Sequence, residues 1–535
     1  MTDNTTWQLR ITSLVFILTC LVSNTGVVAQ EERPDLELEE YRIVGRDTRI
    51  FTIIGDRIST VQFISEPLSL TEEERSIEAS QGLITAGERL FREEEFEVTR
   101  GPYARGDVRS GSRTAAHAWG AASLDMGGKA GTLQVTSRQA EEHTRTNSAP
   151  VIQDIGGVGY FGTTGTRISA ELGFKSENEK LFDKRFRKLR RDTAGYRGGI
   201  TLRTSLGTSW DITGRFSARG SGYKDEDIPY DENEMRFGGT FDAVRDIYNM
   251  TLVSHSAADY LEFGDDTGSM FSTDLKGIML VWKRLGIQLG AQFFSYAMPD
   301  EDAEFRVHPE ARIDWAVSRS SYLRVAYAPG VVRHSHEELY ALNGLVTPES
   351  MLFEDKKVDV DGEIGWRFKP GSLISAGMFY TETEQALVFD QSGRYFSLVR
   401  NASVKITGFR VRTNYDSGGK WGFDGEACIR DAEMNDALDV PYMPAVESVF
   451  RAYIIPYRQW VVHGTFSIFG EHYVRAGSGD TVDAFFTVDC GVERDFLRYF
   501  TFYADMKNIT NAEGAWWTDA SQIPGIGLYA GIKTR

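Results

Sequence analysis

Two histidines lie two positions apart in the segment from Arg333 to Glu338. Successive side chains of an extended chain point to opposite faces, so His334 and His336 share a face. Imidazole nitrogens are good ligands for divalent transition metals, which makes this pair a candidate metal site. The alternative is a polar strand end that runs into an outer loop, and we assign no metal or other cofactor to the chain.

Runs of like-charged residues elsewhere in the sequence are further candidates for binding ligands or ions. A basic run from Lys184 to Arg191 could meet lipopolysaccharide phosphates or an anionic ligand. Acidic runs at 225–227, 231–232 and 300–302 carry hard oxygen donors, but their spacing does not match an EF-hand calcium loop. For both kinds of run the alternative is a solvated loop.

Motifs for catalysis are absent from the sequence. It contains no nucleophile elbow, no His-Glu-x-x-His zinc motif and no phosphate-binding glycine loop. The 8 histidines do not form a pattern with a serine and an acid. A hydrolase whose triad assembles only in space is the alternative, but we expect this protein not to be an enzyme.

The segment from Lys357 to Tyr415 shows which elements position the charged residues. Apolar residues at 358, 360, 364, 366 and 368 alternate with charged residues at 359, 361, 363 and 367. This period of two predicts a strand with one apolar and one charged face. A turn at Lys369–Ser372 leads to a second run over 373–380, and a third follows at 404–415. The inward candidates in this and other strands are Arg203, Arg324, Asp359, Asp361, Arg367, Arg410, Arg412, Asp483 and Asp489.

Similar runs recur along the chain from Arg113 to residue 533, with polar stretches such as 176–193 and 223–234 that predict long loops. Strands with an apolar outer face and a polar inner face are typical of barrels that span the outer membrane. We therefore predict an all-β fold, a transmembrane antiparallel outer-membrane β-barrel of about 20–22 strands with a short N-terminal periplasmic segment. The mixed signs of the inward residues favour neither cations nor anions.

Composition agrees with this fold and excludes some functions. The 535 residues include 59 Lys and Arg against 77 Asp and Glu, and the net charge of −18 disfavours nucleic acid as a partner. The 22 tyrosines and 32 phenylalanines suit interfacial girdles. Strand parity places Cys428 on the inward face and Cys490 on the apolar face, so we expect no disulfide between them.

The N-terminus predicts export. Arg10 precedes an apolar run from Ile11 to Val22, which is too short for a stable anchor, and residues 1–29 fit a cleaved secretory signal peptide. Residues 30–112 form a periplasmic segment or a reduced plug, and residues 113–535 form the barrel. No later stretch is long and apolar enough for a helical span, so export leaves the periplasm, the outer membrane or the exterior as destinations. Together with the predicted barrel, this leads us to expect the outer membrane of a Gram-negative envelope.

Fragments of the second half resemble the barrel of TonB-dependent outer-membrane receptors. They are Ser321–Gly330, Glu338–Tyr340, Val360–Phe368, Met378–Glu382, Asn401–Ala402, Ile406–Val411, Thr487–Asp489, Lys507–Asn511 and Pro524–Gly531, in the order of the family. The segment Tyr41, Arg42, Ile43, Val44 and Gly45 resembles a TonB box, which pairs with TonB by strand addition. A chance match of β-branched residues is the alternative.

The chain also departs from this family. Residues 30–112 are short for a complete plug, and the last residues, Lys533–Arg535, lack the terminal aromatic. The resemblance implies a barrel that binds or passes a solute across the outer membrane. The alternative is a plugless scaffold whose N-terminal segment docks a periplasmic partner. Expected partners are outer-membrane lipid and lipopolysaccharide, the barrel-assembly machinery, a small-molecule ligand, and TonB or another periplasmic protein.

Overall fold

The structure is a computed structural model of the chain. It describes residues 103–534 apart from 112–113, 126–131, 143–150, 163–165, 181–189, 207–209, 226–229, 248–249, 265, 282–283, 298–302, 335–351, 370–371, 393–394, 418–419, 436–437, 458, 475–478, 497–499 and 513–524. The predicted signal peptide, the segment 41–45 and residues 184–189 of the basic run lie outside the described residues, whereas Arg190 and Arg191 begin a strand. No helix among the described residues is long and apolar enough to cross a membrane.

The described chain is all strand. The strands are β1 (Tyr103–Gly111), β2 (Thr114–Asp125), β3 (Thr132–Glu142), β4 (Val151–Gly162), β5 (Thr166–Lys180), β6 (Arg190–Leu206), β7 (Trp210–Asp225), β8 (Tyr230–Ile247), β9 (Met250–Phe263), β10 (Asp266–Val281), β11 (Leu285–Ala297), β12 (Glu304–Trp315), β13 (Ser321–Tyr327), β14 (Gly330–His334), β15 (Leu352–Lys369), β16 (Ser372–Ser392), β17 (Tyr395–Asp416), β18 (Trp421–Met434), β19 (Leu438–Asp439), β20 (Val446–Tyr457), β21 (Trp460–Phe469), β22 (His472–Tyr473), β23 (Thr481–Val482), β24 (Phe485–Phe496), β25 (Phe500–Lys507) and β26 (Gly527–Thr534).

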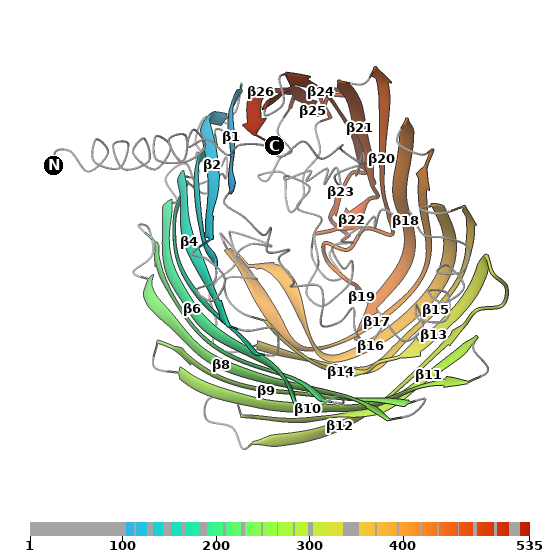
Figure 1. The fold of residues 1–535 in the computed structure, drawn as a ribbon. Helices are drawn as coiled ribbons and strands as arrows, with labels where there is room; N and C mark the ends of the chain where they lie inside the picture. Colours follow the sequence, from blue (N-terminus) through green and yellow to red (C-terminus); the bar gives the residue numbers. More distant parts are fainter. Residues whose placement is uncertain are drawn as a thin grey trace.

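These strands form a closed antiparallel barrel. One sheet contains 24 strands, in which each long strand pairs with its neighbours along the chain and β1 also pairs with β26. Figure 1 shows the resulting ring. β13 and β14 both pair with β15 and count as one stave interrupted at Pro329, which has no N–H for the ladder. Without the two-residue β19, this makes 22 staves, and the predicted fold class is confirmed.

The first stave begins earlier than the sequence suggested. β1 lies within the segment 30–112, but it pairs with β2 over Tyr103–Arg109 and with β26 over Asp107–Gly111. It therefore belongs to the barrel wall, and without it β26 would lose its second partner. The alternation does not reveal β1, because its sequence contains glycines and few alternating apolar residues.

The two ends of the barrel differ in the length of their connections. At the end where β1 begins, consecutive strands are joined by two to six residues, as between β15 and β16. At the other end the connections reach 19 residues, between β25 and β26. Short periplasmic turns and long outer loops are the asymmetry of outer-membrane barrels. We therefore call these the periplasmic end and the mouth.

Several strands extend further than predicted at the mouth. Much of 176–193 and 223–234 belongs to strands, because β5 continues to Lys180 and β7 to Asp225. The predicted loops were therefore too wide at both ends, and their middle parts, 181–189 and 226–229, lie outside the described residues. Strand ends that project beyond the lipid meet water on both faces, so their sequences are polar without being loops.

The two faces of the wall follow the predicted alternation. On β15, Ile364 is 59% exposed on the outer face, whereas its neighbour Glu363 is only 5% exposed. Outward apolar side chains such as Met378 and Phe409 continue this band on the next strands. Cys428 is buried and Cys490 is exposed, and both are free thiols, which confirms their predicted parity. An apolar outer band of this kind requires lipid around the barrel.

Candidate functional site: the inner wall and mouth

The inner wall between β12 and β20 carries an array of paired charges, which we call the charge belt. Its members, all on inward positions, are Arg312, Asp314, Arg324, Asp361, Glu363, Arg410, Arg412, Asp424, Glu426 and Arg451. Five arginines thus face five carboxylates. The belt is neutral as a whole, in line with the mixed lining expected from the sequence.

Arginines of β17 reach the acids of β15 across the intervening strand. Arg410 Nη2 lies 2.5 Å from Asp361 Oδ2, and Arg412 Nη1 lies 3.6 Å from Glu363 Oε2. β16 places Gly377 opposite Arg410 and Phe379 opposite Asp361, and the Arg410 guanidinium lies 5.8 Å from the Phe379 ring. Gly377 has no side chain to separate Arg410 from β15, so the arginine reaches Asp361 beside Phe379.

The belt continues on both sides of this crossing. Arg312 Nε and Arg324 Nε lie 2.7 and 2.9 Å from the carboxylate of Asp314. On the other side, Arg412 Nε lies 3.0 Å from Glu426 Oε2. The hydroxyl of Tyr322 donates to Glu363 and ties the two halves together. Such a wall is wet and polar but presents few unpaired charges to a solute.

The β16–β17 hairpin leaves the wall near the mouth. The register between the two strands shifts on either side of Ala386, and Gln385 has a φ of 55°. Extra residues of this kind bend a strand. Figure 1 shows the hairpin crossing the inside of the ring instead of following the wall. The Leu387 N–H donates to Glu354 Oε1 at 2.9 Å, and both residues are almost fully buried.

A polar cluster lies beside this hairpin contact. Asp355 Oδ1 is 3.3 Å from His308 Nε2, and Asp355 Oδ2 is 3.5 Å from Arg306 Nε. Glu304 Oε2 accepts from Arg306 at 2.7 Å and from the Tyr296 hydroxyl at 2.7 Å. Arg306 and Glu304 are half-exposed and offer donors and an acceptor to a solute at the mouth, whereas His308 and Asp355 are buried behind them.

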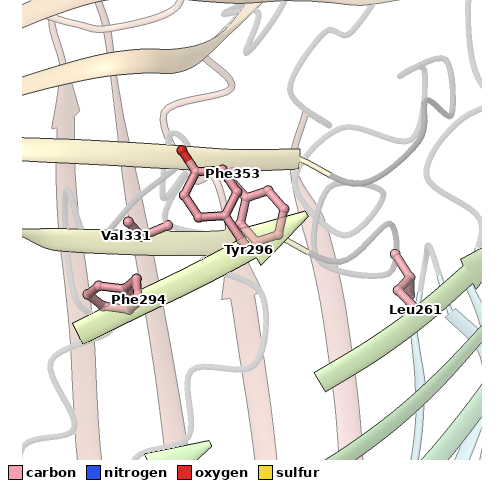
Figure 2. Close-up of a cluster of buried hydrophobic side chains, with 5 residues drawn as sticks. All are labelled: Leu261, Phe294, Tyr296, Val331 and Phe353. Atoms are coloured by element: carbon pink, nitrogen blue, oxygen red, sulfur yellow. The ribbon is translucent and has the colours of Figure 1, made fainter. Parts of the chain in front are cut away.

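Aromatic side chains pack under the polar cluster. A hydrophobic cluster comprises Leu261, Phe294, Tyr296, Val331 and Phe353. Figure 2 shows the rings of Tyr296 and Phe353 side by side, with centroids 4.8 Å apart. Phe294 meets His308 edge-on at 5.8 Å. These side chains are buried, so they form a small hydrophobic core that supports the polar cluster.

The predicted candidates fall in different places. His334 ends β14, whereas His336 lies outside the described residues, and no group of three or more His, Cys, Asp or Glu that could hold a metal occurs among the residues described. Asp489 pairs with Lys507 at 3.1 Å. Arg367 lies over the Tyr322 ring at 5.7 Å. The candidates Arg324, Asp361, Arg410 and Arg412 are brought together in the belt.

Some residues of the site were missed. Asp314 and Glu426 have inward parity on their strands, so the alternation could have found them. His308 has the same inward parity as Asp314, but its contact with Asp355 could not be found from the sequence, because the two residues meet only where β12 and β15 approach each other at the mouth. Proximity of that kind is a property of the closed barrel.

The chain is similar in structure to solved outer-membrane proteins. The copper transporter OprC superposes with a TM-score of 0.67 at 11% identity, over 81% of this chain and 80% of that one. The siderophore receptor PiuA from Acinetobacter baumannii gives 0.65 at 12% identity, over 82% of each chain. The ferric-catecholate import receptor Fiu from E. coli K12 gives 0.62 at 9% identity, over 81% of each chain.

This protein has a TonB-dependent receptor-like fold. No family model and no curated protein matches the sequence. The similar solved structures are named as a transporter and as receptors, not as enzymes. The fold and its apolar outer band place the receptor-like barrel in the outer membrane of a Gram-negative envelope.

Proposed function

We propose that this receptor-like barrel binds a solute at its mouth and passes it across the outer membrane. The observation that carries the proposal is the polar cluster of Arg306, His308 and Asp355, set on aromatic rings where the β16–β17 hairpin folds inward. The charge belt lies on the inner wall towards the periplasmic end. A solute bound at the mouth would next meet this polar wall.

The composition of the mouth indicates a small organic solute with polar groups. The buried rings of Phe294, Tyr296 and Phe353 hold the polar cluster in place, and the half-exposed side chains of Glu304 and Arg306 would contact the solute. Because the charge belt has no net charge, it would discriminate only weakly between solutes of different net charge. Barrels of similar structure are named as a copper transporter and a siderophore receptor. A small solute is therefore compatible with this fold.

We also propose that uptake is coupled to TonB through Tyr41–Gly45. A short extended segment can add to a sheet edge of a partner protein, which is the pairing that this stretch would make. A variant in which Ile43 and Val44 are both proline would retain the barrel and lose this pairing, because proline cannot donate to a ladder. Loss of capture by purified TonB is the expected result.

Conductance in a planar bilayer tests whether solute can cross the barrel. The refolded protein from residue 30 onwards is compared with a variant that lacks residues 30–102 but keeps β1, which the wall requires. A silent longer protein and a conducting shorter one would identify the N-terminal segment as a working plug. Conductance in both would indicate an open, porin-like pore. If both forms insert into the bilayer but neither conducts, the proposal that solute passes through the barrel is wrong.

A further inference from the structure

Cations on the outer face at the periplasmic end are stacked on aromatic rings. The Arg245 guanidinium lies 4.9 Å from the Trp210 ring, and Arg494 lies 5.0 Å from the Trp460 ring. In both cases the two residues are direct cross-strand partners. Lys369 Nζ lies 3.9 Å from the ring of Tyr415. We call these three contacts the rim pairs.

The rim pairs share one level and one face. Each pair lies where its strands begin or end at the short turns, as β7 does at Trp210 and β21 at Trp460. Arg245 and Arg494 have the parity of the outward Phe241 and Phe496. Tyr415 stacks on aromatic rings that are exposed on the outer face: Phe368, Trp421 and Phe423. The cations therefore point towards lipid at its periplasmic boundary.

The rim cations differ from those of the inner wall in having no acid. Every arginine of the charge belt lies within 4 Å of a carboxylate, whereas none of the three rim cations does among the described residues. The whole chain is acidic, with a net charge of −18. Three cations without a carboxylate partner at one level of the barrel are therefore a local exception to the charge of the chain.

We propose that the rim pairs bind the phosphate of anionic phospholipids in the periplasmic leaflet. Guanidinium and ammonium groups form charge-assisted hydrogen bonds with phosphate oxygens, and basic side chains near a membrane surface are attracted to anionic lipids. The aromatic ring holds each cation at the headgroup level, where tyrosine and tryptophan themselves prefer to lie. At the rim pairs an anionic headgroup supplies the counter-charge, whereas Asp and Glu carboxylates supply it to the arginines of the inner wall.

Native mass spectrometry of the full-length protein in detergent tests this proposal with phosphatidylglycerol as the probe and phosphatidylcholine of the same chain length as the comparison. The variant Arg245→Gln/Lys369→Gln/Arg494→Gln removes the three charges. Because one cation near a lipid surface contributes about a fivefold change in affinity, each loss should weaken phosphatidylglycerol retention by roughly that factor. Retention of phosphatidylcholine should not change.

Arg203→Gln is the matched control, because it removes one arginine from an inward position of β6. It should retain phosphatidylglycerol like the unmodified protein. If the triple variant does not fold, as judged by heat-modifiable mobility on a gel, the three single variants give the same comparison. Equal retention of the two lipids by the unmodified protein, or undiminished phosphatidylglycerol retention by folded variants, would overturn the proposal. So would a second copy of the chain that occupies the rim independently of lipid.

Discussion

Arg410 on β17 and Asp361 on β15 form an ion pair although their strands are not hydrogen-bonded neighbours in the sheet. Their side chains meet at 2.5 Å across β16, above Gly377. The contact links β15 and β17 through the lumen as well as through the sheet. It shows that the polar lining connects strands that are not neighbours in the sheet, with Gly377 as a spacer opposite Arg410.

Substitution of the spacer should disrupt the belt. In Gly377→Val, the new Cβ would lie 2.8 Å from the Gly362 carbonyl oxygen, so backbone must move. We expect a loss of about 1–3 kcal/mol in the free energy of unfolding, measured by urea titration in lipid vesicles. Gly362→Ala is the control, since its Cβ would meet only an oxygen at 3.9 Å. Equal effects of the two changes would contradict this role for Gly377.

The ion pair of Arg430 and Glu447 should be costly to break. The two side chains are 3% and 6% exposed and lie 2.6 Å apart. Glu447→Gln leaves a buried guanidinium without its counter-charge, and we expect the free energy of unfolding to fall by about 3–5 kcal/mol. Asp424→Asn, at the more exposed pair with Arg451, should cost about 0.2–1 kcal/mol in the same assay. A small effect at Glu447 would mean that water reaches Arg430.

The inward position of the β16–β17 hairpin should depend on Glu354. Glu354→Ala removes the acceptor of the Leu387 N–H, and an unsatisfied buried amide costs about 1–3 kcal/mol. Amide exchange at 386–388 should therefore become about tenfold to a hundredfold faster, as measured by mass spectrometry. Glu384→Ala, which removes an exposed partner of Lys357, is the control and should leave that exchange unchanged. Unaltered exchange in Glu354→Ala would show that other contacts hold the hairpin.

The two thiols should report the two faces of the wall. Cys490 lies on the outer face and is exposed to lipid, whereas Cys428 is buried on the inner face. A membrane-permeant maleimide should label Cys490 in the folded protein, and Cys428 should react only after unfolding. Peptide mass mapping distinguishes the sites, with Cys490→Ser as the control. Rapid labelling of folded Cys428 by a charged, water-soluble reagent would contradict its burial.

Alternation along the sequence determined the fold class and the faces of the strands. It identified Asp361, Arg410 and Arg412 as inward residues and Cys490 as outward, because a strand has a period of two whatever its partners are. It also indicated the end with short turns, through segments such as Lys369–Ser372.

Only the tertiary structure decided which of these residues meet. Register and the spacer Gly377 pair Arg410 with Asp361, and closure of the ring adds β1 to the wall despite its weak pattern. The bend at Gln385 turns the hairpin inward. His308 and Asp355 approach through the curvature of the wall. These outcomes depend on distances between strands remote in sequence, which a local periodicity does not contain.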